Sequence, residues 1–403
     1  RLIVMNFLQY AVWGAWLISL GAYLGNTLKF DGLQIGSFFA TMGIASLFMP
    51  AVMGIIADRW IPAQRLLGLC HLFAAGFITL AATRTDYNSL YTLVLLSVMF
   101  YMPTIALSNS VAYNALEKAG LDTVTHFPPI RVWGTVGFIC AMWVVDLGKM
   151  GLSATQLYFS ATLGLILGLY SFTLPNCPIN RSGGGKSIVD LLGLRAFALF
   201  KQRKMAIFFI FSMLLGMSLQ ITNAFADGYI KSFGDTGIHG AKYLGTFGVE
   251  HSTILISLSQ ISETLCILLI PFFLKRFGIK RVMLIAMFAW VLRFALLGAG
   301  NPGPGVWMFI LSMIVYGVAF DFFNISGSLF VEKETSAAIR SSAQGVFMIM
   351  TNGLGALIGS YLAGWVVNHY GWPLSWYLFA GFSLVVAIVF AVIFKYKHDP
   401  NRI

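Results

Sequence analysis

Residues Ile254–Phe273, ILISLSQISETLCILLIPFF, form an apolar run long enough to cross a lipid bilayer as a helix. A helix rises about 1.5 Å per residue, and the hydrocarbon core requires about 20 residues. Near the middle of the run stand Gln260 and Glu263, whose three-residue spacing puts them on one helix face. A charge at this depth is costly unless it faces a bundle interior or a wet cavity. The pattern predicts a pathway-lining face, although polar side chains, Gln260 more readily than Glu263, also join helices to one another.

The composition extends this conclusion to the whole chain. Of the 403 residues, 58% are hydrophobic and 10% are charged, which is too little polar surface for a soluble protein. The 26 Lys and Arg outnumber the 15 Asp and Glu, but they lie in the short gaps between apolar runs, so they indicate membrane topology rather than nucleic-acid binding. The four cysteines lack metal-ligand spacing, so we expect no metal, no disulfide framework and no cofactor.

The apolar runs predict an all-α integral membrane protein with twelve transmembrane helices in two six-helix halves. The expected spans are residues 3–26, 35–57, 65–84, 89–113, 129–148 and 154–175 in the first half, and residues 204–231, 250–274, 280–299, 304–330, 341–367 and 373–395 in the second. The polar, partly Gly-rich stretch 176–203 is typical of a linker. The predicted domains are therefore residues 1–175 and 204–403.

The basic residues predict the orientation of the chain. With the N-terminus in the cytoplasm, most Lys and Arg, including those of the linker and the C-terminal tail, fall on the cytoplasmic side. Because cytoplasmic loops carry an excess of Lys and Arg, we expect both termini and the linker to be cytoplasmic.

The two halves show a weak internal repeat. Residues 54–65, GIIADRWIPAQR, correspond to residues 271–281, PFFLKRFGIKR, about 217 residues later. Two repeated six-span halves around a linker are the organisation of the major facilitator superfamily, in which the substrate sits at mid-membrane between the halves. Asp58 and Arg59 of the first turn are candidates for conformational gating, with solvated loop charges as the alternative interpretation.

The seventh predicted span contains a second polar face, in the stretch MLLGMSLQITNAFADGYI, residues 213–230. Gln220 and Asn223 stand three residues apart, and their amides offer both donors and acceptors to a neutral, hydroxylated or heterocyclic solute. Asp227 extends this face toward the outer end, where we expect a solvated residue at the mouth of the pathway.

The tenth predicted span, around MIVYGVAFDFFNISGSLF at residues 313–330, combines aromatic and acidic side chains. Tyr316 and Phe320 are four residues apart and are expected to stack, either as packing or as a wall for a planar ring. Asp321 lies about midway along the span beside Asn324.

Two basic residues lie within spans. Arg293 is some six residues from an outer end and is expected to snorkel to the surface. Arg131 is expected to open the fifth helix directly after two prolines, with Thr135 and Phe138 on the same face. All six histidines fall at span ends or in loops by these boundaries, and none is expected to carry a proton.

Several long stretches resemble one known family. They are FLQYAVWGAWLISLG (7–21), YMPTIALSNS (101–110), FPPIRVWGTVGF (127–138), KMAIFFIFSMLLG (204–216), LQITN (219–223), SQISETL (259–265), PFFLKRFGIK (271–280) and SMIVYGVAFDFFNISGS (312–328). In order along almost the whole chain, they are similar to the bacterial nucleoside:proton symporters of the major facilitator superfamily, a family of nucleoside and xanthosine permeases.

The resemblance implies roles for individual residues. It implies that Gln220, Asn223, Gln260 and Glu263 hydrogen-bond a nucleoside. It further implies that the same cavity is lined by Arg131, Thr135, Phe138, Tyr316 and Phe320. Asp321 is implied to be a buried acid important to transport. Because desolvation favours the neutral form of a carboxyl group, we expect Asp321 or Glu263 to carry the proton, with Asp321 slightly favoured.

The expected function is therefore proton-coupled import of nucleosides by alternating access, by a monomer in the bacterial inner membrane. The expected partners are a nucleoside, protons and the lipid bilayer. An alternative is facilitated diffusion, or symport of another polar solute such as a sugar. A remote alternative is a membrane-embedded enzyme or a receptor, but the sequence offers no nucleophile–base pair or metal cluster for catalysis.

Overall fold

The computed structural model describes residues 1–179, 194–336 and 339–396, and every regular element in these ranges is a helix. The chain forms two compact units. The first comprises residues 1–30 and 37–192, and the second comprises residues 31–36 and 193–403. Half of the predicted linker, residues 180–193, lies outside the described residues.

Nine helical segments in the described ranges are long and apolar enough to cross a membrane. The predicted first and sixth spans are shorter helices, α1 (Leu2–Gly14) and α7 (Thr155–Ser171). The predicted eighth and ninth spans run together as one segment, Ser252–Ala299. The all-helical, multi-span architecture is confirmed, whereas the count of twelve spans stays a prediction.

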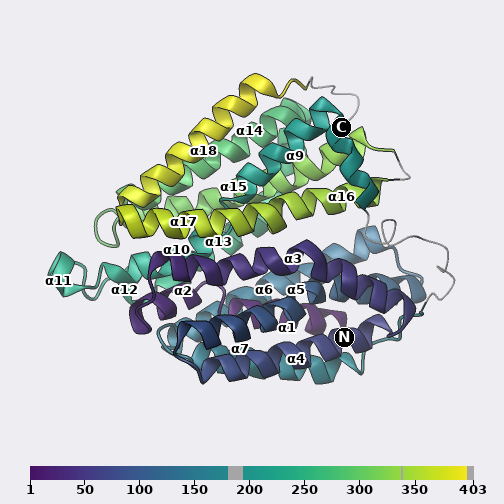
Figure 1. The fold of residues 1–403 in the computed structure, drawn as a ribbon, viewed down its shortest axis with the longest axis horizontal. Helices are drawn as coiled ribbons and strands as arrows, with labels where there is room; N and C mark the ends of the chain where they lie inside the picture. Colours follow the sequence, from purple (N-terminus) through teal and green to yellow (C-terminus); the bar gives the residue numbers. More distant parts are fainter. Residues whose placement is uncertain (180–193, 337–338, 397–403) are drawn as a thin grey trace. The chain divides into compact units, whose positions relative to one another are not determined.

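The first unit is built from long helices that pack side by side (Figure 1). Its remaining elements are α2 (Leu20–Ala22), the π-helix η1 (Tyr23–Thr27), α3 (Gly32–Arg59), α4 (Ala63–Ala82), α5 (Tyr87–Lys118) and α6 (Thr123–Leu147). Helix α1 packs on α6 and α7, and α4 packs on α5 and α7. A Cβ atom at Gly137 of α6 would collide with the backbone of Phe7, so a small residue is what lets α1 and α6 approach closely.

Helix α6 begins earlier than the sequence predicts. It starts at Thr123, so Pro128 and Pro129 lie inside the helix and not before it. The prediction that Arg131 opens this helix is therefore wrong, because Arg131 follows two full turns of helix. Membrane helices tolerate proline where neighbouring groups satisfy the freed carbonyls, which is why the prolines are a poor boundary signal here.

The second unit has more and shorter elements. They are the 3-10 helices η2 (Leu194–Lys201) and η3 (Ile267–Leu269), the π-helix η4 (Ile349–Gly355), and helices α9 (Arg203–Gly216), α10 (Ile221–Ser232), α11 (Thr236–His239), α12 (Phe247–Glu250), α13 (Ser252–Cys266), α14 (Ile270–Ala299), α15 (Val306–Glu334), α16 (Arg340–Met348), α17 (Ala356–Tyr370) and α18 (Leu374–Ile393). Helix α14 packs on α15 and α18, and α13 packs on α15.

Gly278 interrupts α14. Its φ of 82° and ψ of 173° are far from helical values, and glycine adopts a positive φ without the steric cost that a side chain brings. The interruption falls between residues 274 and 280, where the sequence predicts the loop between the eighth and ninth spans. The interruption at Gly278 thus agrees with the predicted division of the segment Ser252–Ala299 into two spans, which stays a prediction.

The first long helix of each unit is broken. In the first unit, residues 15–19 form turns between α1 and α2, and in the second unit residues 217–220 do so between α9 and α10. At the second break, a Cβ atom at Gly216 would collide with the backbone of Thr351, so the two chain segments are in close contact. Each half therefore has an interrupted helix at a corresponding position.

Candidate functional site

The break between α9 and α10 presents two amide side chains. Gln220 directly precedes α10 and makes no side-chain capping hydrogen bond, and Asn223 lies in the first turn. The Asn223 Nδ2 atom donates to Gln220 Oε1 at 3.0 Å, which confirms that the two side chains share one face. Both residues are half-buried, so their remaining polar atoms stay open to a further partner.

Helix α13 packs against both α10 and α15, and it carries Gln260 and Glu263. The Oε1 atom of Gln260 is buried and has no hydrogen-bond partner among the described residues. A buried acceptor without a partner costs about 1–3 kcal/mol, which a donor from a bound solute would recover. Glu263 is half-buried and lies within electrostatic range of Tyr316 and Asp321 on α15.

Helix α15 presents the aromatic pair and the acid. The rings of Tyr316 and Phe320 stack with centroids 5.6 Å apart and planes at 15°, as their spacing predicts. Asp321 is 4% exposed, and its Oδ2 atom has no hydrogen-bond partner in the described part of the chain. Burying an ionised carboxylate that lacks hydrogen-bond partners is costly.

Arg293 of α14 does not snorkel, contrary to the prediction. Its side chain is 2% exposed, and Nη1 donates to the carbonyl oxygen of Ser312 at 2.9 Å. The Cζ atom lies 4.7 Å from the centroid of the Tyr316 ring. The guanidinium is thus held inside the second unit, over the ring of Tyr316.

Asp227 is likewise not the solvated mouth residue that the sequence predicts. It is 1% exposed, and its Oδ1 atom accepts hydrogen bonds from Ser252 Oγ at 2.6 Å and Thr253 Oγ1 at 3.1 Å. Its Oδ2 atom accepts from Lys231 Nζ at 2.7 Å. Asp227 therefore fastens α10 to the first turn of α13, and these two helices carry the four polar residues described above.

We expect Asp227→Ala to destabilise the protein strongly. The substitution leaves Lys231, whose side chain is 15% exposed, without its anion, and breaking a buried ion pair costs about 3–5 kcal/mol. Thermal unfolding of the purified protein in detergent measures the effect. Asp235→Ala, in an exposed turn, is the control and should shift the unfolding temperature far less. Equal shifts for the two variants would contradict the assignment.

In the first unit, three predicted residues line up on α6. The Arg131 guanidinium lies over the ring of Tyr10, with Cζ 3.9 Å from the centroid. Thr135 is half-buried, and the Phe138 ring meets Trp13 edge-on with centroids 6.4 Å apart. Their contacts thus place Arg131 and Phe138 against α1.

A buried polar network lies beside them. The Gln9 Oε1 atom accepts a hydrogen bond from His71 Nε2 at 2.7 Å, and the Gln9 Nε2 atom donates to Thr104 Oγ1 at 2.8 Å. His71 is fully buried within α4, so its expected place at a span end is wrong. The network ties α1, α4 and α5 together.

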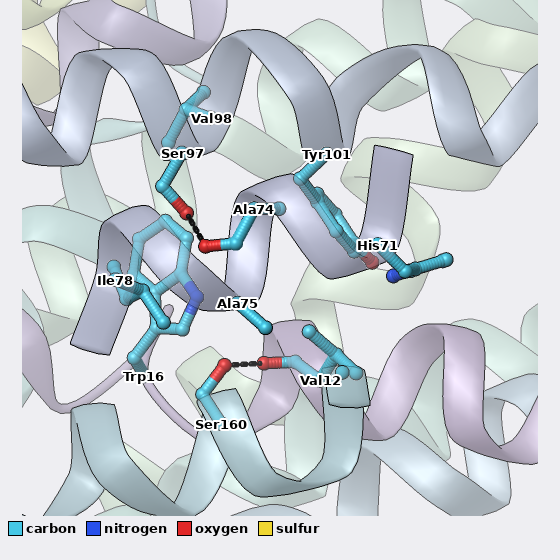
Figure 2. Close-up of a pocket in the computed structure, with 11 residues that line it drawn as sticks. Val12, Trp16, His71, Ala74, Ala75, Ile78, Ser97, Val98, Tyr101 and Ser160 are labelled. Atoms are coloured by element: carbon cyan, nitrogen blue, oxygen red, sulfur yellow. Dashed lines mark hydrogen bonds between the residues drawn. The ribbon is translucent and has the colours of Figure 1, made fainter. Parts of the chain in front are cut away.

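His71 and Tyr101 also line a small pocket, shown in Figure 2. In the same view the Ser97 and Ser160 hydroxyls donate to the backbone oxygens of Ala74 and Val12, at 2.8 and 2.7 Å. Because these hydroxyls bond the backbone of neighbouring helices, we interpret the pocket as part of the packing within the first unit.

Asp58 and Arg59 end helix α3, with Asp58 exposed and Arg59 half-buried. Their gating role stays a prediction. Within residues 1–179, 194–336 and 339–396, no group of three or more His, Cys, Asp or Glu residues is arranged to hold a metal ion.

The comparisons with known proteins cover almost the whole chain and point to one family. A family model described as "Nucleoside H+ symporter" matches residues 1–399. The nucleoside permease NupG of Escherichia coli (strain K12) is 51% identical over 405 residues, which cover 99% of this chain and 96% of NupG. The xanthosine permease of the same strain is 50% identical over 410 residues, covering 100% of this chain and 97% of the permease.

The fold agrees as well. A crystal structure of the nucleoside transporter NupG superposes with a TM-score of 0.91 at 51% identity, covering 98% of each chain. These relatives are transporters and not enzymes. The chain is therefore a multi-span membrane transporter that belongs to the nucleoside H+ symporter family.

Proposed function

We propose that this protein imports nucleosides together with protons, by alternating access, across the bacterial inner membrane. Membership of the nucleoside H+ symporter family supports both substrates. The observation that carries the proposal is the polar face of the second unit, where the Gln220–Asn223 pair stands at a helix break and Gln260 Oε1 is buried without a partner among the described residues.

The four polar residues of α10 and α13 hydrogen-bond the nucleoside in this proposal. The amides of Gln220, Asn223 and Gln260 donate to and accept from the edge of the base, because amides offer both kinds of group. The Glu263 carboxylate accepts from the ribose hydroxyls, which are donors that free bases lack. This division of roles predicts that free bases and free sugars bind more weakly than nucleosides.

Aromatic and basic residues complete the proposed site. Tyr316 and Phe320 form a wall on which the base stacks, supported by the parallel arrangement of their rings. Base stacking on aromatic side chains contributes about 1–3 kcal/mol per base. Arg131, Thr135 and Phe138 of the first unit contribute further contacts to the nucleoside.

Asp321 carries the proton in this proposal, with Glu263 as the alternative. An inward gradient supplies about 2.3 kcal/mol per charge per 100 mV and about 1.4 kcal/mol per pH unit. Either term is enough to concentrate a neutral solute several-fold. Because Glu263 is engaged with the ribose, Asp321 is the acid that stays available for the proton.

The remaining assignments concern the whole molecule. The halves 1–175 and 204–403 are joined by the linker 176–203, and both termini lie in the cytoplasm, as the distribution of Lys and Arg favours. Asp58 and Arg59 contribute to gating between the conformations. The protein acts as a monomer in the lipid bilayer.

Competition for radiolabelled uridine uptake tests the substrate class. The purified protein is placed in liposomes, with and without an inward proton gradient, and challenged with nucleosides, free bases and sugars. We expect nucleosides to compete strongly, free bases and sugars weakly, and uridine to accumulate only with the gradient. Adding a protonophore should abolish accumulation and leave equilibration intact.

Two other outcomes would overturn the proposal. Strong competition by free sugars and none by nucleosides would indicate a sugar transporter. Uptake that stops at equilibrium whatever the gradient would indicate facilitated diffusion.

A further inference from the structure

We propose that Arg293 is a positioning residue for nucleoside binding, which acts by holding the Tyr316 ring in place. The inference rests on the proposed function, because it explains what orients the aromatic wall of Tyr316 and Phe320 on which the base stacks. Arg293 itself is 2% exposed and its guanidinium lies over the Tyr316 ring, so it acts through that ring and not by touching the substrate.

The guanidinium of Arg293 connects three helices. Its Nη1 atom donates to Ser312 O at 2.9 Å and to Ser259 Oγ at 3.4 Å, and Ser312 Oγ donates back to the Arg293 carbonyl oxygen at 3.0 Å. Ser312 belongs to α15, the helix that carries Tyr316, and Ser259 belongs to α13, directly before Gln260. Arg293 therefore sets the position of α14 relative to α13 and α15, two of the three helices that carry proposed binding residues in the second unit.

The Tyr316 ring is held by three neighbours. Arg293 lies over it, with Cζ 4.7 Å from the ring centroid. The Trp290 ring meets it at 86° with centroids 6.0 Å apart, and Phe320 stacks on it at 5.6 Å. Trp290 is fully buried, and removal of Arg293 would leave the Tyr316 ring without its neighbour on one face.

The buried guanidinium of Arg293 carries its charge without an ion pair in the described part of the chain. No carboxylate forms a salt bridge with it among the described residues, and its Nε atom has no hydrogen-bond partner there. A buried guanidinium without a carboxylate carries a desolvation penalty that an apolar side chain of similar length would avoid. The charge strengthens the hydrogen bond to the Ser312 carbonyl oxygen, and it also attracts the face of the Tyr316 ring, to which a planar guanidinium is suited.

Two acidic side chains also interact electrostatically with Tyr316. Glu263 of α13 and Asp321 of α15 are both within electrostatic range of the Tyr316 ring. Helix α18, which also packs on α14, contains no Asp, Glu, Lys or Arg. Tyr316 is thus the common neighbour of the buried cation and of the two acids, and its orientation is the property that Arg293 controls.

The test is a double-mutant cycle on uridine transport. We expect Arg293→Met to raise KM about tenfold, equivalent to about 1.4 kcal/mol, with the maximal rate per molecule of protein changed less than about twofold. Arg293→Lys keeps the charge but not the planar group, and should raise KM less than Arg293→Met does. Arg84→Met, the same change at an exposed position, is the control and should leave KM unchanged.

The cycle separates positioning from general stability. If Arg293 acts through Tyr316, the effect of Arg293→Met on KM should disappear in a Tyr316→Leu background, because the two changes are then not additive. An unchanged effect in that background would overturn the inference, as would a loss of maximal rate at constant KM. If Arg293→Met does not fold, Arg293→Lys alone and in the Tyr316→Leu background supplies the same comparison.

The cycle also separates this inference from the proposed site. If Tyr316→Leu raises KM and Arg293→Met does not, the aromatic wall stands and the positioning role is wrong. If Tyr316→Leu leaves KM unchanged, the wall itself is wrong.

Discussion

Glu263→Ala should weaken uridine binding at least a hundredfold. A hydrogen bond to a charged acceptor contributes about 1.5–3 kcal/mol, and the proposed site gives the Glu263 carboxylate both ribose hydroxyls. Losing two such bonds costs at least about 3 kcal/mol, which corresponds to more than a hundredfold in Kd. Glu263→Gln keeps one acceptor oxygen, so its affinity for uridine should lie between those of the unmodified protein and of Glu263→Ala. Binding of radiolabelled uridine to the purified variants measures the change.

A second glutamate of the same unit provides the control. Glu250 is exposed at the end of α12, two residues before α13, and Glu250→Ala should leave uridine affinity unchanged. If Glu263→Ala binds uridine within twofold of the unmodified protein, Glu263 is not a ligand to the nucleoside.

Asp321→Asn should abolish uphill uridine accumulation while preserving uridine exchange. Asparagine fills nearly the same volume and keeps an acceptor oxygen, but it does not take up or release a proton near neutral pH. For one proton per nucleoside, each unit of pH gradient supports about a tenfold accumulation of uridine in the unmodified protein. The variant should reach only the external concentration, measured in liposomes with an imposed gradient.

Exchange of internal for external uridine without a gradient shows whether the variant is intact. Asp321→Asn should perform it at a rate close to that of the unmodified protein, independently of external pH. If the variant still accumulates uridine with normal pH dependence, the proton is carried elsewhere, and Glu263 becomes the candidate.

The sequence predicted the polar faces well because these depend on local spacing. The Gln220–Asn223 pair and the Tyr316–Phe320 stack are contacts between residues three or four apart, which a helix brings together wherever it lies. The burial of Asp321 followed from its place in the middle of a long apolar run. These features required no knowledge of neighbouring helices.

Asp227 and Arg293 were misjudged because their partners are distant in sequence. Asp227 bonds Ser252 and Thr253, some 25 residues away, and Arg293 bonds Ser312, 19 residues away. Distance from a span end suggested solvent for both, but packing against a second helix decided their surroundings. One local signal was available: Asp227 and Lys231 have the four-residue spacing of a helical ion pair.

The sequence pattern also did not predict the helix interruptions. The break at residues 217–220 lies within a run that is apolar enough for a continuous span, and hydropathy does not register it. Close backbone contact at Gly216 accompanies the break, and such a contact depends on η4, more than 130 residues later. The proposed binding region of the second unit was therefore inferred from its polar residues and not from its backbone.

A structure of the protein with uridine bound tests the central claim most directly. We predict that the ribose hydroxyls lie within hydrogen-bond distance of Glu263, that the base edge lies within the same reach of Gln220, Asn223 or Gln260, and that the base stacks on Tyr316 or Phe320. Uridine bound away from α10 and α13, with Glu263 and Gln220 directed toward lipid or into separate helix contacts, would contradict the account.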